Sequence, residues 1–155
     1  MKAFIISGLL FVFIFSNVLA NQRPEAKSSG DKKEKSGVIH LDKESFKDLV
    51  FDYEKNKEWN YNGKVPAILD FYADWCGPCR QVAPILTQMQ EEYKGNIQVF
   101  KVDTDVEKEL AAIFGIRSLP TIVFIPVDGE PQAALGARPK AELEKMVTEI
   151  LKVTK

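Results

Sequence analysis

The chain has two cysteines, and both lie in the segment Trp75-Cys76-Gly77-Pro78-Cys79-Arg80. Residues 67–73 before it are mostly apolar, which is typical of a buried parallel strand, and the residues after it predict a helix. Cys76 would then lie at a strand-to-helix junction, where free backbone N–H groups and the helix dipole stabilise a thiolate. A pair that can close a small disulfide and activate one sulfur predicts thiol–disulfide exchange.

Two other possible roles for the cysteine pair are a zinc site and a purely structural disulfide. A zinc site needs about four ligands, whereas the chain offers two cysteines and one histidine, His40. A complete zinc site within one chain is therefore not expected, and neither is another metal or a cofactor. A purely structural disulfide across this pair would close a very small loop and remove little entropy from the unfolded chain. We therefore expect the cysteines to serve reactivity.

Residues 1–20 have the pattern of a signal peptide that directs export. Lys2 supplies a positive charge, residues 3–15 form a mostly apolar segment of 13 residues, and Val18-x-Ala20 matches the small-residue motif before a cleavage site. The apolar segment is shorter than the ~20 residues that a membrane-spanning helix needs. We therefore expect cleavage after Ala20 and a periplasmic or other extracytoplasmic location. The alternative is an uncleaved membrane anchor.

Cleavage would leave 135 residues with 20 basic and 22 acidic side chains, a net charge of −2. This length fits one domain with a sizeable core, and the near balance of charge argues against a dedicated nucleic-acid-binding protein. Residues 21–36 contain no large apolar side chain. Such a segment cannot bury enough surface to offset its ordering entropy. We therefore expect a disordered tether at 21–36 and one domain at 37–155.

Strands and helices alternate along this domain. We expect strands at 38–41, 67–73, 97–103, 121–125 and 132–135. We expect helices at 43–53, 106–114 and 139–153, and one more helix that begins at the cysteine segment and ends at Tyr93. Asp128-Gly129 predicts the turn of a hairpin between the last two strands. This order predicts an α/β fold with a central mixed sheet covered by helices on both faces. His40 is interpreted as a partly solvated strand residue rather than a catalytic base.

Three segments of the chain together resemble the thioredoxin family. They are Asp70-Phe71-Tyr72-Ala73-Asp74-Trp75-Cys76-Gly77-Pro78-Cys79-Arg80, Val82-Ala83-Pro84-Ile85-Leu86 and Phe114-Gly115-Ile116-Arg117-Ser118-Leu119-Pro120-Thr121. They occur in the order and spacing of that family, and the resemblance covers about residues 38–153. It implies the thioredoxin fold. Together with the predicted signal peptide, it implies similarity to an exported, extracytoplasmic bacterial thioredoxin.

The resemblance also implies a role for each reactive residue. Cys76 corresponds to the exposed attacking thiol, and Cys79 to the buried resolving thiol. Asp70 corresponds to a buried carboxylate that exchanges a proton with Cys79. A lone acid in an apolar segment also favours burial and a raised pKa, and the alternative is a carboxylate at a strand end. Lys101 corresponds to the family lysine near this carboxylate, and the alternative is a solvated strand lysine.

A substrate groove beside the cysteines follows from the same resemblance. Its residues would be Trp75, Gly77, Pro78, Leu119, Pro120 and Gly136. Gly77 and Pro78 would shape the turn, and Trp75 would shield the cysteine pair. Pro120 corresponds to the cis-proline of the family, whose preceding backbone lines the groove. The alternative for Gly136 is an ordinary turn after a strand.

These residues predict a protein thiol–disulfide oxidoreductase that reduces disulfide-containing substrate proteins. We expect a monomer that exchanges electrons with a separate donor or acceptor and binds no nucleic acid. The alternative is a thioredoxin-fold polypeptide-binding module or holdase with non-essential cysteines. The chain departs from the usual family pattern in three places. Ser118-Leu119 replaces a common glycine and β-branched pair, Arg80 replaces the more usual lysine and keeps the positive charge, and the loop at 54–66 is several residues longer than usual.

Overall fold

The computed structural model describes residues 37–155, so the predicted signal peptide and tether at 1–36 lie outside the described residues. The domain is built on a sheet of five strands in the order β1-β3-β2-β4-β5. The strands are β1 (Ile39–His40), β2 (Ala67–Tyr72), β3 (Gln98–Asp103), β4 (Thr121–Ile125) and β5 (Gln132–Leu135). β1, β3 and β2 are parallel, whereas β4 is antiparallel to β2 and β5 is antiparallel to β4. The sheet is mixed, as the sequence predicts.

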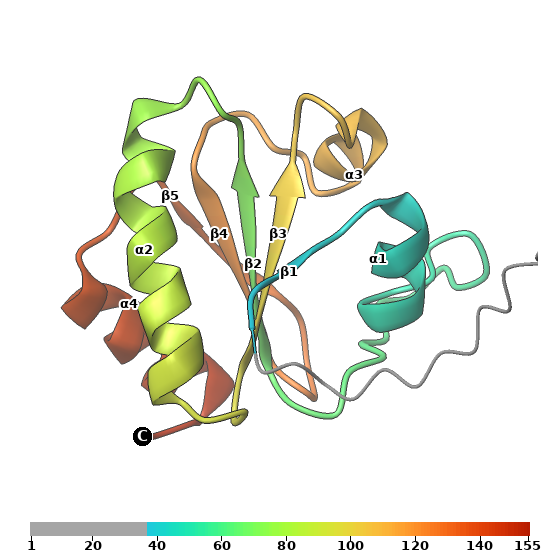
Figure 1. Ribbon diagram of the computed structural model, residues 1–155. Coiled ribbons are helices and arrows are strands. Elements are labelled where there is room, and N and C mark those ends of the chain that lie inside the picture. The colour runs from blue at the N-terminus through green and yellow to red at the C-terminus, as the bar shows by residue number, and fades with distance from the viewer. Residues whose placement is uncertain (1–36) are drawn as a thin grey trace, which may run out of the picture. The chain divides into compact units, whose positions relative to one another are not determined.

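Helices cover both faces of this sheet. They are α1 (Lys43–Leu49), α2 (Gly77–Glu92), α3 (Lys108–Ile113), α4 (Lys140–Met146) and η1 (Val147–Leu151), a π-helical continuation of α4. Figure 1 shows α2 and α4 on one side of the sheet and α1 and α3 on the other. The predicted architecture is therefore confirmed.

Each face of the sheet has its own hydrophobic core. On one face Ile68 packs in a cluster with Leu86 of α2, and on the other face Leu69 packs in a cluster with Leu110 of α3. Successive residues of a strand point to opposite faces. Asp70, two residues after Ile68, therefore points to the face that α2 covers. Because of this alternation, the buried Asp70 carboxylate faces α2 and not α3.

The first helix is shorter than the sequence predicts. It ends at Leu49 and not near residue 53. The loop that follows supplies the reason. The Asn62 side-chain amide donates a hydrogen bond to the Lys47 carbonyl at 2.9 Å, and the Asn62 backbone N–H donates to the Val50 carbonyl at 2.9 Å. Asn62, late in this loop, therefore donates hydrogen bonds to two backbone carbonyl groups at the end of α1.

Two other helices also differ from their predicted bounds. α3 begins at Lys108 rather than residue 106, because a turn precedes it in which Asp103 accepts hydrogen bonds from the backbone N–H groups of Asp105 and Glu107. The last helix begins at Lys140 rather than residue 139, changes to π-helical geometry after Met146 and ends before Lys152, not at residue 153. Lys152 adopts a left-handed backbone conformation with φ 59°.

The strands match their predictions more closely. Only Ile39 and His40 of the predicted strand at 38–41 pair in the sheet, although the Leu41 N–H still donates to the Lys101 carbonyl at 2.8 Å. β2 ends one residue early at Tyr72, and β3 begins one residue late at Gln98.

None of the helices in residues 37–155 has both the length and the apolar composition that a membrane-spanning helix needs.

Candidate functional site

Cys76 and Cys79 form a disulfide with their Cα atoms 5.3 Å apart. Cys76 is the N-cap residue of α2, and its Sγ accepts a hydrogen bond from the Cys79 backbone N–H at 3.2 Å. The first turn of α2 contains no acidic residue. A thiolate on Cys76 would therefore meet a backbone donor and the positive end of the helix dipole without an opposing charge from that turn. The predicted strand-to-helix junction is present.

Both cysteines are buried in the disulfide form, at 3% exposed each. The exposed Cys76 that the family resemblance implies is therefore wrong for this state of the protein. Cys76 is covered because it clusters with Ala73 and Cys79, and because the half-buried side chains of Tyr72 and Leu119 pack against this cluster. We call these three residues, Ala73, Cys76 and Cys79, the disulfide cluster.

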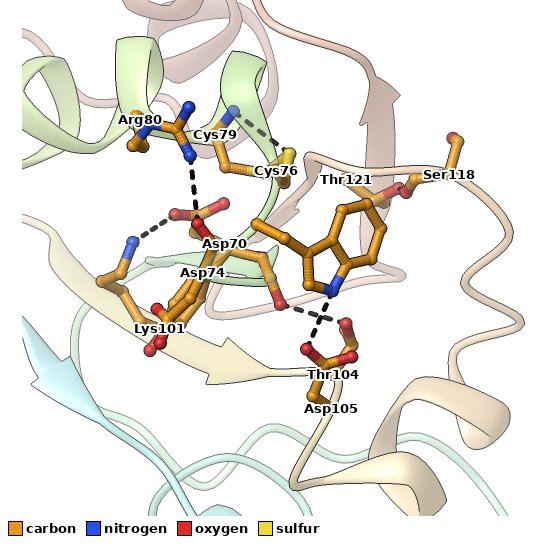
Figure 2. The surroundings of a disulfide bond; sticks show 12 residues. Asp70, Asp74, Cys76, Cys79, Arg80, Lys101, Thr104, Asp105, Ser118 and Thr121 are labelled. Carbon is orange, nitrogen blue, oxygen red and sulfur yellow. Dashed lines mark hydrogen bonds and ion pairs between the residues drawn. A yellow bond between two sulfur atoms is a disulfide. The ribbon is translucent and has the colours of Figure 1, made fainter.

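Asp70 is fully buried, and its Oδ2 atom accepts a hydrogen bond from Lys101 Nζ at 2.7 Å (Figure 2). The Lys101 side chain is itself only 12% exposed. Burial raises the pKa of the Asp70 carboxyl, and the Lys101 cation opposes part of this rise. Asp70 is therefore not a solvated carboxylate at a strand end, and Lys101 is not a solvated strand lysine.

The second carboxylate oxygen of Asp70 is buried and, within residues 37–155, has no hydrogen-bond partner. Buried polar atoms are nearly always paired, so an unpaired one needs an explanation. Asp70 points to the sheet face covered by α2, and the first turn of α2 carries Cys79. A carboxylate in this position has an oxygen free to exchange a proton with a neighbouring group.

Two loops carry the predicted groove residues Leu119, Pro120 and Gly136. The Leu119–Pro120 peptide bond is cis, the isomer that the family resemblance implies. Leu119 contacts the disulfide cluster. The backbone N–H of Gly136 donates to the Pro120 carbonyl at 2.8 Å. Gly136 has φ +81°, a left-handed conformation that favours glycine.

Trp75 is 70% exposed, and its indole N–H donates to the Asp105 carboxylate at 2.9 Å. This bond, drawn as a dashed line to Asp105 in Figure 2, fixes an exposed aromatic ring next to the cysteines. On the other side of the turn, the Arg80 guanidinium donates to the Asp74 carbonyl at 3.1 Å. The cysteine turn is thus held from both sides.

Sequence reasoning missed two residues of this site, Asp105 and Tyr72. Asp105 lies in an exposed turn 30 residues from Trp75, and no local pattern identifies it. Tyr72 packs against the disulfide cluster, and its ring centroid lies 4.1 Å from Lys101 Nζ. The strand alternation could have identified Tyr72, because it lies two residues after Asp70 and faces the same side.

Comparisons with known proteins agree with this geometry. The thioredoxin family model matches residues 37–149. The chain is 44% identical over 110 residues to the thioredoxin of Borreliella burgdorferi, covering 71% of this chain and 94% of that protein. It is 32% identical over 114 residues to the thioredoxin of Haemophilus influenzae, covering 74% and 97% of the two chains. A crystal structure of chloroplastic thioredoxin z matches with a TM-score of 0.63 at 30% identity, covering 76% of this chain and 96% of that one.

Proposed function

The chain belongs to the thioredoxin family, whose members are disulfide oxidoreductases, and from this premise we propose that it reduces disulfide bonds in substrate proteins with Cys76 and Cys79. The observation that carries the proposal is the disulfide at the N-terminus of α2, on the sheet face that also holds the buried Asp70. In this proposal the structure is the oxidised form, which is the product of one reductive turnover.

The first step is nucleophilic attack by Cys76. Its thiolate, stabilised by the Cys79 N–H and the helix dipole, attacks one sulfur of the substrate disulfide. A mixed disulfide forms between Cys76 and the substrate, and the other substrate sulfur leaves as a thiolate. Leu119, Pro120 and Gly136 would hold the substrate chain during this step.

The second step is resolution by Cys79. The Asp70 carboxylate accepts the Cys79 proton, and the new thiolate attacks the Sγ of Cys76. The substrate leaves as a second thiolate, which takes a proton from water. The substrate disulfide has then gained two electrons, and the Cys76–Cys79 pair has lost them. A separate reductant must restore the dithiol before the next turnover.

Single-cysteine variants test this mechanism with insulin as the substrate. Cys76→Ser should abolish insulin reduction by dithiothreitol-coupled turnover, because no nucleophile remains for the first step. Cys79→Ser that is reduced beforehand and then freed of dithiothreitol should stop after the first step and accumulate a mixed disulfide with an insulin chain. Mass spectrometry of the quenched reaction identifies that adduct, and circular dichroism of both variants checks that they fold.

The two variants are matched controls for each other, because each removes one sulfur from the same turn. Full insulin reduction by Cys76→Ser would contradict the proposal. Retained suppression of insulin aggregation by Cys76→Ser, without reduction, would instead favour a holdase.

We further propose that the protein acts outside the cytoplasm. The support is the sequence of residues 1–20, which has a positive charge, an apolar segment and a small-residue cleavage motif. Expression of the full chain in a Gram-negative host should yield a periplasmic protein whose N-terminal residue is Asn21. Edman sequencing of the periplasmic fraction measures this. A cytosolic protein that still begins at Met1 would contradict export.

A further inference from the structure

His40, Lys101 and Asp70 lie in one row across the three parallel strands. His40 of β1 is the register partner of Lys101 of β3, which is the register partner of Asp70 of β2. Register partners point to the same face of a sheet, so all three side chains lie on the face that α2 covers. The row begins at the exposed His40 on the edge strand and ends at the fully buried Asp70.

Tyr72 connects this row to the disulfide cluster. Its hydroxyl lies 3.4 Å from His40 Nδ1, and the two rings meet edge to face with centroids 6.1 Å apart. The centroid of the Tyr72 ring lies 4.1 Å from Lys101 Nζ, a cation–π distance. Tyr72 also packs against the disulfide cluster. A solvent-facing imidazole is thus linked by direct contacts to the residues around Asp70 and Cys79.

We propose that His40 is a positioning residue at the exposed end of this row, where a positive charge favours the carboxylate form of Asp70 and so extends the Cys79 step to lower pH. This inference rests on the proposed role of Asp70 as the acceptor of the Cys79 proton. Histidine is the side chain that gains its charge between about pH 8 and pH 5. A positive charge on the His40 side chain would be the second cation in a row that already contains Lys101.

The charges around the row support this direction of the effect. Burial raises the pKa of Asp70, and Lys101 and, to a smaller extent, His40 act against this rise. Burial, and then the carboxylates of Asp103 and Asp74, raise the pKa of Tyr72, so its hydroxyl keeps its proton. That hydroxyl can donate to a neutral His40 and accept from a protonated one.

The size of the effect follows from the strand spacing. Two strand spacings of about 4.8 Å separate the backbones of His40 and Asp70 by about 9.6 Å. At an effective dielectric constant of about 40 to 80, a unit charge at that distance changes the protonation equilibrium of a carboxyl by about two- to fourfold. An effect of this size is measurable as a shift in a pH–rate profile, although it is small beside the contribution of either cysteine.

The test separates the two chemical steps with a chromogenic disulfide, 5,5′-dithiobis(2-nitrobenzoic acid). Rapid mixing of the reduced protein with an equimolar amount of this probe should release thionitrobenzoate in two phases, the first from Cys76 attack and the second from Cys79 resolution. We compare His40→Gln, which is neutral at every pH, with His40→Arg, which is always charged.

On the acid side of the pH–rate profile, the second phase of His40→Gln should be about two- to fourfold slower than that of His40→Arg, with the first phase unchanged. Lys57→Gln is the matched control, because it removes one positive charge from an exposed loop away from the row, and it should behave as wild type. In an Asp70→Asn background, the difference between the Gln and Arg variants should disappear.

Each failure has a separate meaning. Identical second-phase profiles for the two His40 variants would overturn the inference and leave the proposed function intact. Equal slowing of both phases in His40→Gln would also overturn it, because a structural defect would then explain the change. A wild-type reaction without a second phase would overturn the proposed function itself.

Discussion

At the scale of single residues, two opposing effects act on the Asp70 carboxyl. Removal from water disfavours its charged form and has the larger effect, while the cation of Lys101, 2.7 Å away, favours the charged form. The result is a raised pKa for Asp70. A carboxyl of this kind can take up and release a proton closer to the pH at which thiols react than an ordinary aspartate can.

Replacement of Asp70 by Asn should stabilise the protein at high pH. The folded pKa of Asp70 lies above the unfolded value of 3.8, so the native state binds the extra proton. The stability that Asp70 provides is therefore fully present below the unfolded pKa and is lost as the pH rises through the folded pKa. Each unit of pKa difference corresponds to about 1.4 kcal/mol. Urea unfolding of both proteins at pH 5 and pH 9 measures the change.

Two further measurements make this prediction specific to the charge. Lys101→Met removes the cation that lowers the pKa of Asp70, so its stability should fall more steeply with pH than that of the wild type. Asp70→Asn should also slow disulfide exchange, because the amide cannot accept the Cys79 proton. An Asn variant with unchanged stability at pH 9 and an unchanged exchange rate would contradict both the burial argument and the proton transfer.

The reactive residues could be found from sequence to different extents. Cys76, Cys79 and Asp70 were identifiable because two are the chain's only cysteines and the third is a lone acid in an apolar strand. Asp105 was not identifiable, because its role depends on the path of the turn after β3 relative to Trp75. The burial of Cys76 was also missed, because Tyr72 and Leu119, which cover the disulfide cluster, come from two separate segments.

At the scale of elements, apolar residues recur at positions i, i+3, i+4, i+7 and i+11 along α2 and its C-cap residue, a spacing that predicts one buried helix face. Of these residues, Val82, Leu86, Met89 and Tyr93 lie in the core, and Ile85 is half-buried. The same helix buries Gln90, whose side chain accepts from the Val99 N–H at 2.5 Å and donates to the Ile97 carbonyl at 3.2 Å. These hydrogen bonds between Gln90 and the β3 segment depend on tertiary contacts, so the apolar periodicity of the helix could not predict them.

The long loop at 54–66 has a structural role that the sequence did not reveal. Its Trp59 ring packs against Phe51, with centroids 4.9 Å apart, and against Phe114, at 6.2 Å. Phe114 directly follows α3 and precedes the segment that ends in the cis peptide bond before Pro120. The loop therefore supports the residues that lead into the predicted groove. It also supplies Asn62, which ends α1 earlier than local helix propensity would.

At the scale of the whole domain, the fold was predictable because local sequence patterns indicate both the order of the strands and helices and the apolar face of each one. The order of strands and helices sets the connections, and the apolar residues of each element set the faces. β2 has buried residues on both faces, Ile68 on one and Leu69 on the other, so helices must cover both. The ends of elements were less predictable, because residues from distant segments decide them.

Ion pairs at one end of this domain join segments that no local pattern connects. Glu92 near the end of α2 pairs with Lys140 at the start of α4, at 2.5 Å, and with Lys155. Hydrogen bonds from Lys140 and then Lys155 lower the pKa of Glu92 to about 2. Lys155 also pairs with Glu144 at 2.6 Å, so the cluster connects α2, α4 and the last residue of the chain.

Glu92→Gln should therefore destabilise the domain at neutral pH and have little effect in strong acid. The folded pKa of about 2 lies below the unfolded value of 4.5, so the stability that Glu92 provides is present above the unfolded pKa and is lost as the pH falls toward 2. The decrease in the urea midpoint should be small, because these side chains are partly exposed, and 1 M salt should reduce it. Glu91→Gln removes the same charge from the neighbouring, exposed position of α2 and is the matched control. A midpoint difference for Glu92→Gln that stays constant from pH 7 to pH 2 would show that the side chain acts through packing rather than charge.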